Sequence, residues 1–159
     1  MITQFSGLNQ EESDLMMEAI PLVTVLIAGA DGEIDKEEKE WAAKLTKIRS
    51  YNHPENWNDF YKSVGENYSE KLDALISSLP SETEARNAVI STRLAALNDL
   101  LPKIDKHAAY SFYRGLTSFA EHVAKASGGF LRIGAISREE KKWIGLPMIT
   151  PVPEPEEEV

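Results

Sequence analysis

The fold is decided by the stretch ADGEIDKEEKEW, residues 30–41, which returns near the other end of the chain as GAISREEKKW, residues 134–143. Residues 34–41 align with residues 136–143 at a constant offset of 102. Self-similarity of this kind indicates one supersecondary unit used twice. The sequence therefore predicts two related halves that form an internal pseudo-two-fold repeat.

Helical periodicity recurs along the chain, whereas no alternating run of β-branched and aromatic residues is bounded by hairpin turns. We therefore expect an all-α fold, a single-domain bundle of about six to seven helices over residues 1–146. Residues 147–159 contain four prolines and four glutamates and too little apolar surface to offset the entropy of ordering, which predicts a disordered tail. The predicted helices cover residues 9–30, 35–48, 55–64, 69–79, 81–101 and 105–126, and a last helix begins at Ser137.

The helix at residues 9–30 is predicted to be central, because its apolar residues occupy more than one face. Asn9 and Glu12 have the spacing of a capping box at its start. Pro21 is expected to kink or split it. The face predicted to be buried comprises Met16, Ala19, Leu22, Val23, Val25, Leu26, Ile27 and Ala30.

Two further helix starts follow from capping signals. Ser81 with Glu84 predicts a capping box, and Asp105 is the expected cap of the long helix at residues 105–126. The inward face of the first of these helices is predicted to be Ala85, Val89, Thr92, Ala96 and Leu100. That of the second is predicted to be Ala109, Phe112, Tyr113, Leu116, Ala120 and Val123.

Composition limits the classes of function. The chain has 159 residues and no cysteine, so it has neither disulfides nor thiolate metal ligands. The net charge of −9 and the alternation of lysine with glutamate disfavour nucleic acid as a partner. The longest apolar stretch, residues 20–30, is too short to span a bilayer, and the N-terminal residues lack a secretory pattern. We expect a cytoplasmic protein without membrane insertion.

Residues 31–38 have the spacing D-G-x-I-x-x-x-E, which is the second half of an EF-hand loop. An ordinary EF-hand is excluded, because Ile27 and Gly29 stand where its first two carboxylates belong. The closely spaced acids repel one another, and a hard divalent cation would relieve that repulsion. The alternative is that Asp35 is a helix cap, Glu38 its capping-box partner and Gly32 a left-handed helix terminator.

Enzymatic motifs are not found. Residues 129–134 have the glycine spacing of a phosphate-binding loop, but the required lysine is replaced by alanine. The three histidines, His53, His107 and His122, do not show metal-ligand spacing. We therefore expect no catalytic residue and no organic cofactor. Trp41 and Trp143 occupy matching positions in the two halves, which indicates either core packing or a groove for a partner helix.

The two stretches resemble the TerB-like domains of tellurite resistance and related bacterial stress proteins. The resemblance rests on two corners, a first corner at residues 27–39, IAGADGEID followed by KEEK, and a second corner at residues 123–141, where VAKASGG precedes ISREEK. It implies an all-helical bundle with two halves and a non-enzymatic role in membrane-linked or stress-response assemblies.

The resemblance also implies a divalent metal, such as calcium or magnesium, at Asp31, Asp35 and Glu38. Only Glu140 matches a ligand position in the second corner, where Ser127 stands in place of an aspartate. We therefore expect a metal-binding module, and we also expect it to bind a protein partner. The alternative is a metal-independent interaction or scaffold domain whose acidic corner serves only as a set of caps.

Overall fold

The computed structural model describes residues 3–30, 34, 36–51, 57–126 and 138–156. This part of the chain consists of helices and connecting segments without a strand, which confirms the predicted all-α class. The 3-10 helices are η1 (Thr3–Phe5) and η2 (Leu101–Lys103). The α-helices are α1 (Gln10–Ala28), α2 (Lys36–Arg49), α3 (Asn58–Gly65), α4 (Tyr68–Ser78), α5 (Thr83–Ala95), α6 (Leu97–Leu100), α7 (Lys106–Ala126) and α8 (Arg138–Ile144).

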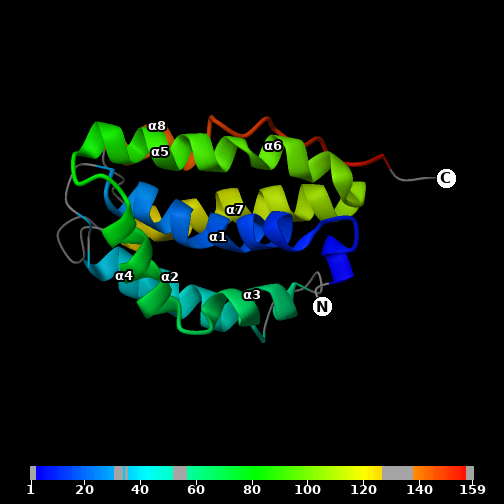
Figure 1. The fold of residues 1–159 in the computed structure, drawn as a ribbon, viewed down its shortest axis with the longest axis horizontal. Coiled ribbons are helices and arrows are strands. Elements are labelled where there is room, and N and C mark those ends of the chain that lie inside the picture. Colours follow the sequence, from blue (N-terminus) through cyan, green and yellow to red (C-terminus); the bar gives the residue numbers. More distant parts are fainter. Residues whose placement is uncertain (1–2, 31–33, 35, 52–56, 127–137, 157–159) are drawn as a thin grey trace.

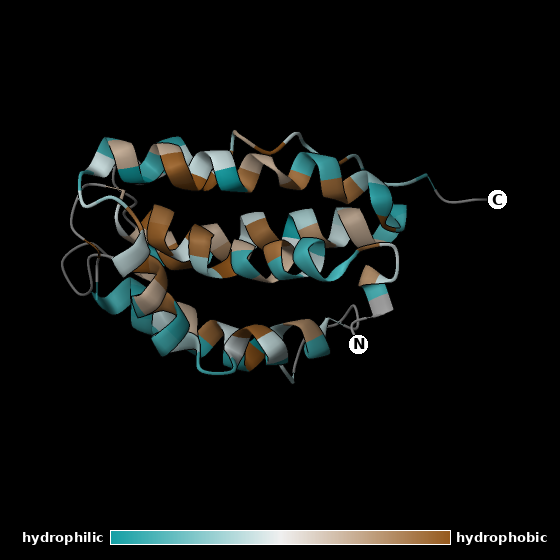
Figure 2. Cartoon of the chain, in the orientation of Figure 1, coloured by the Kyte–Doolittle hydropathy of each residue, from teal (hydrophilic) through white to brown (hydrophobic). Residues whose placement is uncertain are grey.

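The helices form three layers (Figure 1). α1 and α7 lie side by side in the middle, α5, α6 and α8 cover one side, and α2, α3 and α4 cover the other. Apolar residues concentrate on the helix faces that point toward the middle layer (Figure 2). The α1–α7 pair is therefore the scaffold on which the shorter helices are placed.

α1 is the most enclosed helix, as the sequence predicts. It contacts each of the helices α2 to α8, and every residue from 19 to 30 is buried. The predicted capping box is present, with Glu12 N–H donating to Asn9 Oδ1 at 2.9 Å and Asn9 N–H donating to Glu12 Oε1 at 3.0 Å. Pro21 does not split the helix, which continues through it to Ala28. Packing on all sides holds the helix together at the one residue that lacks a backbone N–H.

α5 differs from its prediction in both its cap and its buried face. Glu82, not Ser81, is the N-cap, and its carboxylate accepts hydrogen bonds from the backbone N–H groups of Glu84 and Ala85 at 3.2 and 2.8 Å. Of the expected inward face, Leu100 is buried, Val89 and Ala96 are half-buried, and Ala85 and Thr92 are exposed, so the prediction was wrong at the last two. The buried residues of α5 and α6 are Arg86, Asn87, Ile90, Leu94, Leu97 and Leu100. Arg86 and Asn87 are polar and lie on the buried face, so the pattern of apolar residues does not indicate which face of α5 is buried.

α7 matches its prediction. Asp105 Oδ2 accepts hydrogen bonds from the N–H groups of His107 and Ala108 at 3.0 and 3.2 Å, which confirms the cap. The predicted stripe is buried except for Tyr113, which is half-buried. Edge-to-face and tilted ring contacts, with centroids 5.4 to 6.0 Å apart, join α7 to α3 and η1 through Phe5, Trp57, Phe60 and Phe112.

Candidate functional site at the helix corners

The predicted metal ligands are only partly within the described structure. Asp31 and Asp35 lie outside the described residues. Glu38 lies in the first turn of α2 and is 1% exposed. Across the part of the chain that is described, no group of three or more histidine, aspartate or glutamate side chains is placed to hold a metal ion. The three-residue metal site and the capping alternative both stay predictions.

Arg86 of α5 is a buried cation at the end of α1, and the sequence analysis did not identify it. Its Nη2 donates a hydrogen bond of 2.7 Å to the carbonyl oxygen of Gly29, and the residue is 5% exposed. A Cβ atom at Gly29 would lie 2.6 Å from that nitrogen and 3.1 Å from Cγ1 of Ile34. Glycine is therefore the residue that allows the guanidinium to approach the helix end so closely.

The position of this guanidinium has an electrostatic reason. The C-terminal end of a helix carries partial negative charge, and basic side chains there are stabilising. α1 has no basic residue in its own last turn. Arg86 supplies that charge from a helix 57 residues further along the chain. The first corner thus contains a permanent positive charge that the protein itself provides.

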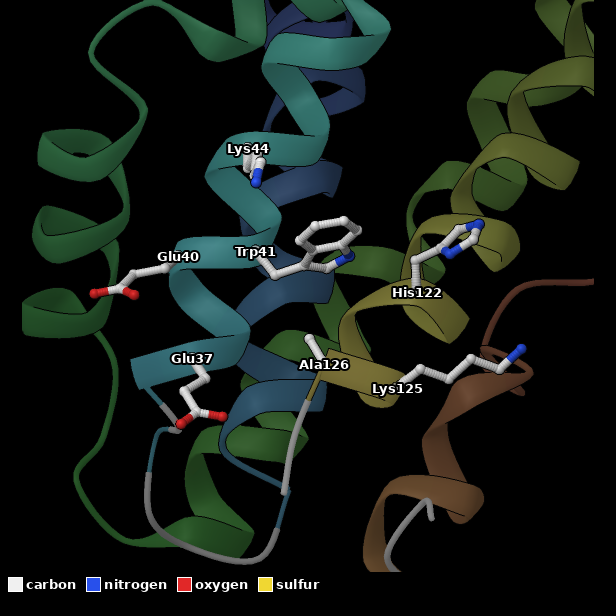
Figure 3. A pocket seen from close by; sticks show the side chains of 7 residues that line it. All are labelled: Glu37, Glu40, Trp41, Lys44, His122, Lys125 and Ala126. Atoms are coloured by element: carbon white, nitrogen blue, oxygen red, sulfur yellow. The ribbon is translucent and has the colours of Figure 1, made fainter. Parts of the chain in front are cut away.

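Beside the first corner, a shallow pocket of about 500 Å³ lies between α2 and α7. In Figure 3 the indole of Trp41 occupies the space between the two helices, with Lys44 one turn further along α2 and His122 across from it on α7. The ammonium of Lys44 lies 5.7 Å from the indole centroid. The other lining residues are Glu37, Glu40, Lys125 and Ala126.

The charged groups around Trp41 do not converge on one point. Glu40 and Lys125 point to opposite sides, away from the indole (Figure 3). Lys125 is paired with Glu121 at 2.8 Å, and its ammonium lowers the pKa of that carboxyl group. Proton transfer requires an acid and a base within reach of one reacting atom. Glu40 and Lys125 are therefore not both placed at one such atom in the described structure.

A second pocket, of about 550 Å³, lies between α5, α8 and the end of α1. It is lined by Trp143 and Lys142 from α8, and Lys142 lies 5.0 Å from the centroid of the adjacent indole. Ala30 contributes from the end of α1, and polar residues of α5 complete the wall. Among these, Asn87 is 7% exposed, and its buried Oδ1 atom has no hydrogen-bond partner among the described residues.

The remaining residues considered in the sequence fall into two groups. His107 is exposed at the start of α7, and His122 is exposed beside Trp41. The others lie outside the described residues, namely His53, the glycine-rich residues 129–134, Ser127 and Ser137. Arg86 and Asn87 could not be identified beforehand, because each carries significance only through contacts with α1 or α8.

The comparisons with known proteins returned no match. No family model matches the chain, and no curated protein or solved structure is similar to it. Within the described ranges, none of the helices combines the length and the apolar character needed to cross a membrane.

Proposed function

We propose that the chain is a TerB-like, non-enzymatic module that mediates protein interaction through the surfaces beside its two corners. The observation that carries the proposal is the reciprocal construction of the two tryptophan pockets. Trp41 of the first half faces Ala126 at the end of α7, and Trp143 of the second half faces Ala30 at the end of α1.

This reciprocity is what an internal two-fold repeat requires. Trp41 and Trp143 are equivalent at the offset of 102 residues. Ala30 and Ala126 are equivalent at an offset of 96, in the alignment of residues 27–32 with residues 123–128 at the start of the two corners. Each short corner helix, α2 or α8, contacts both long helices of the middle layer. These shared contacts of α2 and α8 support the proposed pseudo-repeat and, through it, the proposed TerB-like assignment.

The surfaces are suited to binding because aromatic rings with polar surroundings are enriched in interaction sites. Half-buried indoles beside lysine ammonium groups provide apolar area and charge together. We further propose that the interaction belongs to a stress-response assembly, as the TerB resemblance implies, and that it takes place in the cytoplasm, which the absence of cysteine suits.

A divalent cation at Asp31, Asp35 and Glu38 is a separable part of the proposal. It is supported by the spacing of the three acids and by the position of Glu38 in the first turn of α2. The metal-independent alternative is favoured by Arg86, because a buried guanidinium already places positive charge at the end of α1. In that alternative the acids only cap and solubilise the corner.

Calorimetric titration of calcium, magnesium, manganese and zinc into chelator-treated protein separates the two. A cation at one hundred times its Kd raises the free energy of unfolding by about 2.7 kcal/mol. We expect this stabilisation in the wild type, its loss in Asp31→Asn, and its retention in the control Asp59→Asn on α3. Absence of both heat and thermal shift in the wild type would leave the metal-independent alternative.

The interaction itself is tested with a chelator present, so that it does not depend on the cation. Affinity capture from native cells should return a protein that is lost with Trp41→Ser and kept with Lys47→Ala, an exposed change on the same helix. A partner that binds both variants equally would place the interaction elsewhere.

A further inference from the structure

The residues after α8 form an ordered segment against the bundle, which we call the C-terminal strap (residues 146–156). It begins at Leu146, which is fully buried and has a φ of 49°. A left-handed backbone costs a non-glycine residue roughly 1–2 kcal/mol. Burial of the leucine side chain offsets this strain and turns the chain out of α8. Figure 1 shows the strap running along the side of the bundle that carries α5 and α6.

Burial along the strap repeats every third residue. Leu146 and Ile149 are 0% and 2% exposed, and Val152 and Pro155 are half-buried. The positions between them are exposed except for Met148, which is half-buried. A polyproline II helix has three residues per turn and a solvated backbone without internal hydrogen bonds. The strap begins instead with a turn, in which the N–H of Ile149 donates to the carbonyl oxygen of Leu146 at 3.0 Å. Only the part from Thr150 to Glu156 is free of helix and turn, and its prolines at every second position from Pro151 suit the polyproline II geometry.

Asn98 of α6 holds the strap by its backbone. Its Nδ2 donates to the carbonyl oxygen of Met148 at 3.0 Å, and its Oδ1 accepts from the N–H of Thr150 at 2.8 Å. One side-chain amide thus satisfies a donor and an acceptor of an extended segment. Such recognition reads the backbone and does not depend on the side chain of Thr150, which is exposed.

These contacts have the character of a ligand in a groove. Extended, proline-rich segments are bound in this way because their conformation is ordered before they bind. The predicted disordered tail, residues 147–159, thus has an observed contact with the bundle from Met148 to Val152.

We propose that the surface along α6, centred on Asn98, is a docking groove for an extended proline-rich segment, and that the strap of a second copy of this chain binds there when the strap of the first is released. The chain's own strap is the sequence seen to fit, with apolar residues three positions apart. Exchange of an identical element between two copies is a low-cost route to dimers. The proposal is independent of the cation at the first corner.

Release needs a hinge before the strap, and Gly145 lies there. It is exposed, and a Cβ atom at this position would meet none of the other described residues within 4 Å, its chain neighbours aside. Leaving the core relieves the left-handed backbone of Leu146 but exposes its side chain, so the bound strap stays the favoured state and release is a minor one. In the intact chain the strap competes at an effective concentration in the millimolar range, which keeps dilute wild-type protein monomeric.

Complementary variants test the exchange in the full-length chain. Ile149→Ser/Val152→Ser disables the strap and leaves Asn98 in place, whereas Asn98→Ala disables the groove and leaves the strap intact. We expect an equimolar mixture to form a heterodimer in analytical ultracentrifugation, while each variant alone remains monomeric. A labelled peptide of residues 144–159 should bind the strap-disabled variant about tenfold more tightly than it binds the wild type, because self-competition is removed.

The result that overturns the proposal is equally direct. If both variants have wild-type circular dichroism and neither the heterodimer nor peptide binding is seen, the strap is a fixed part of the fold. If a variant does not fold, hydrogen exchange of the wild-type chain decides. We expect the Thr150 amide to exchange through local opening, well before the amides of α1. Exchange of Thr150 only by global unfolding would refute release.

Discussion

Arg49 and Tyr61 form a buried hydrogen bond of 2.7 Å, donated by Nη1 of the guanidinium to the phenolic oxygen. The same nitrogen donates to the carbonyl oxygen of Gly115 at 3.0 Å, and Nη2 donates to Ser118 Oγ at 3.3 Å. The guanidinium also lies 5.2 Å from the centroid of the tyrosine ring. A single side chain of α2 thereby connects α3 and α7.

Tyr61→Phe tests this connection. The change keeps the ring and removes the acceptor of a buried charged donor, so we expect a loss of roughly 1–3 kcal/mol in the free energy of unfolding, measured with urea. Arg49→Lys should lose a similar amount, because an ammonium lacks the planar fork that reaches Tyr61, Gly115 and Ser118 together. Ordinary surface substitutions change stability by up to about 0.5 kcal/mol. If both variants lose less than this, the connection contributes little to stability.

Tyr68 predicts a specific loss of stability at alkaline pH. Its hydroxyl lies 2.5 Å from Thr24 Oγ1, which itself donates to the carbonyl oxygen of Ile20, so the tyrosine is the donor. Burial raises the pKa of Tyr68 above the ordinary value of 10.0, and burial also raises that of Tyr61. Above pH 10 the unfolded chain therefore releases protons that the folded chain retains, and stability falls as pH rises.

Urea unfolding between pH 8 and pH 11 measures the effect. We expect the free energy of unfolding to fall above pH 10 with a limiting slope of about 1.4 kcal/mol per pH unit for each tyrosine. Tyr68→Phe should remove the contribution of that residue, and the exposed Tyr51→Phe is the control. An unchanged slope in Tyr68→Phe would contradict the assignment.

Gly29→Ala tests the close approach of Arg86 to the end of α1. The added Cβ would meet Nη2 at 2.6 Å, so the guanidinium must move and its hydrogen bond to the Gly29 carbonyl must lengthen. We expect a loss of roughly 1–3 kcal/mol, measured by chemical denaturation.

Gly65→Ala is the matched control, because a Cβ there would lie 3.7 Å from Thr46 Oγ1, an ordinary contact. Its effect should stay within about 1 kcal/mol. Equal effects of the two alanine substitutions would mean that Arg86 adjusts at no cost.

The buried face of α5 is tested by two neighbouring substitutions. Ile90 is fully buried, whereas Thr92, which the sequence placed inward, is exposed. We expect Ile90→Ala to cost about 2–5 kcal/mol. Thr92→Ala should change stability by no more than about 0.5 kcal/mol. If its effect exceeded that of Ile90→Ala, the face predicted from the sequence would be the buried one.

Helix starts were predictable where their signals are local. Asn9 and Glu12, three residues apart, each accept a hydrogen bond from the other's backbone N–H at the start of α1. Asp105 caps α7 by accepting a hydrogen bond from the N–H of His107, two residues further on. The face of α5 was not predictable in this way. Arg86 and Asn87 are polar residues on a buried face; Arg86 contacts the end of α1, and Asn87 lines a pocket that residues of α8 also line.

Only the spacing of the acidic residues at the candidate site was predictable from the sequence. Residues 31–38 indicated a corner with several acids, but the buried cation beside it comes from residue 86, and no periodicity connects the two. The matching positions of Trp41 and Trp143 were visible in the sequence. That Trp41 shares a pocket with Ala126, and Trp143 a pocket with Ala30, required the structure.

The enclosure of α1 by every other α-helix has a consequence for how the chain folds. Residues 19–28 of α1 are all buried, so this half of the helix is not stable in water until its neighbours cover it, and those neighbours extend from residue 36 to residue 144. Most of its contacts therefore close long loops, so folding is expected to be slow for a helical protein and all-or-none. No sub-bundle that omits one of the layers should persist alone, because it would leave part of this helix uncovered and prone to aggregation.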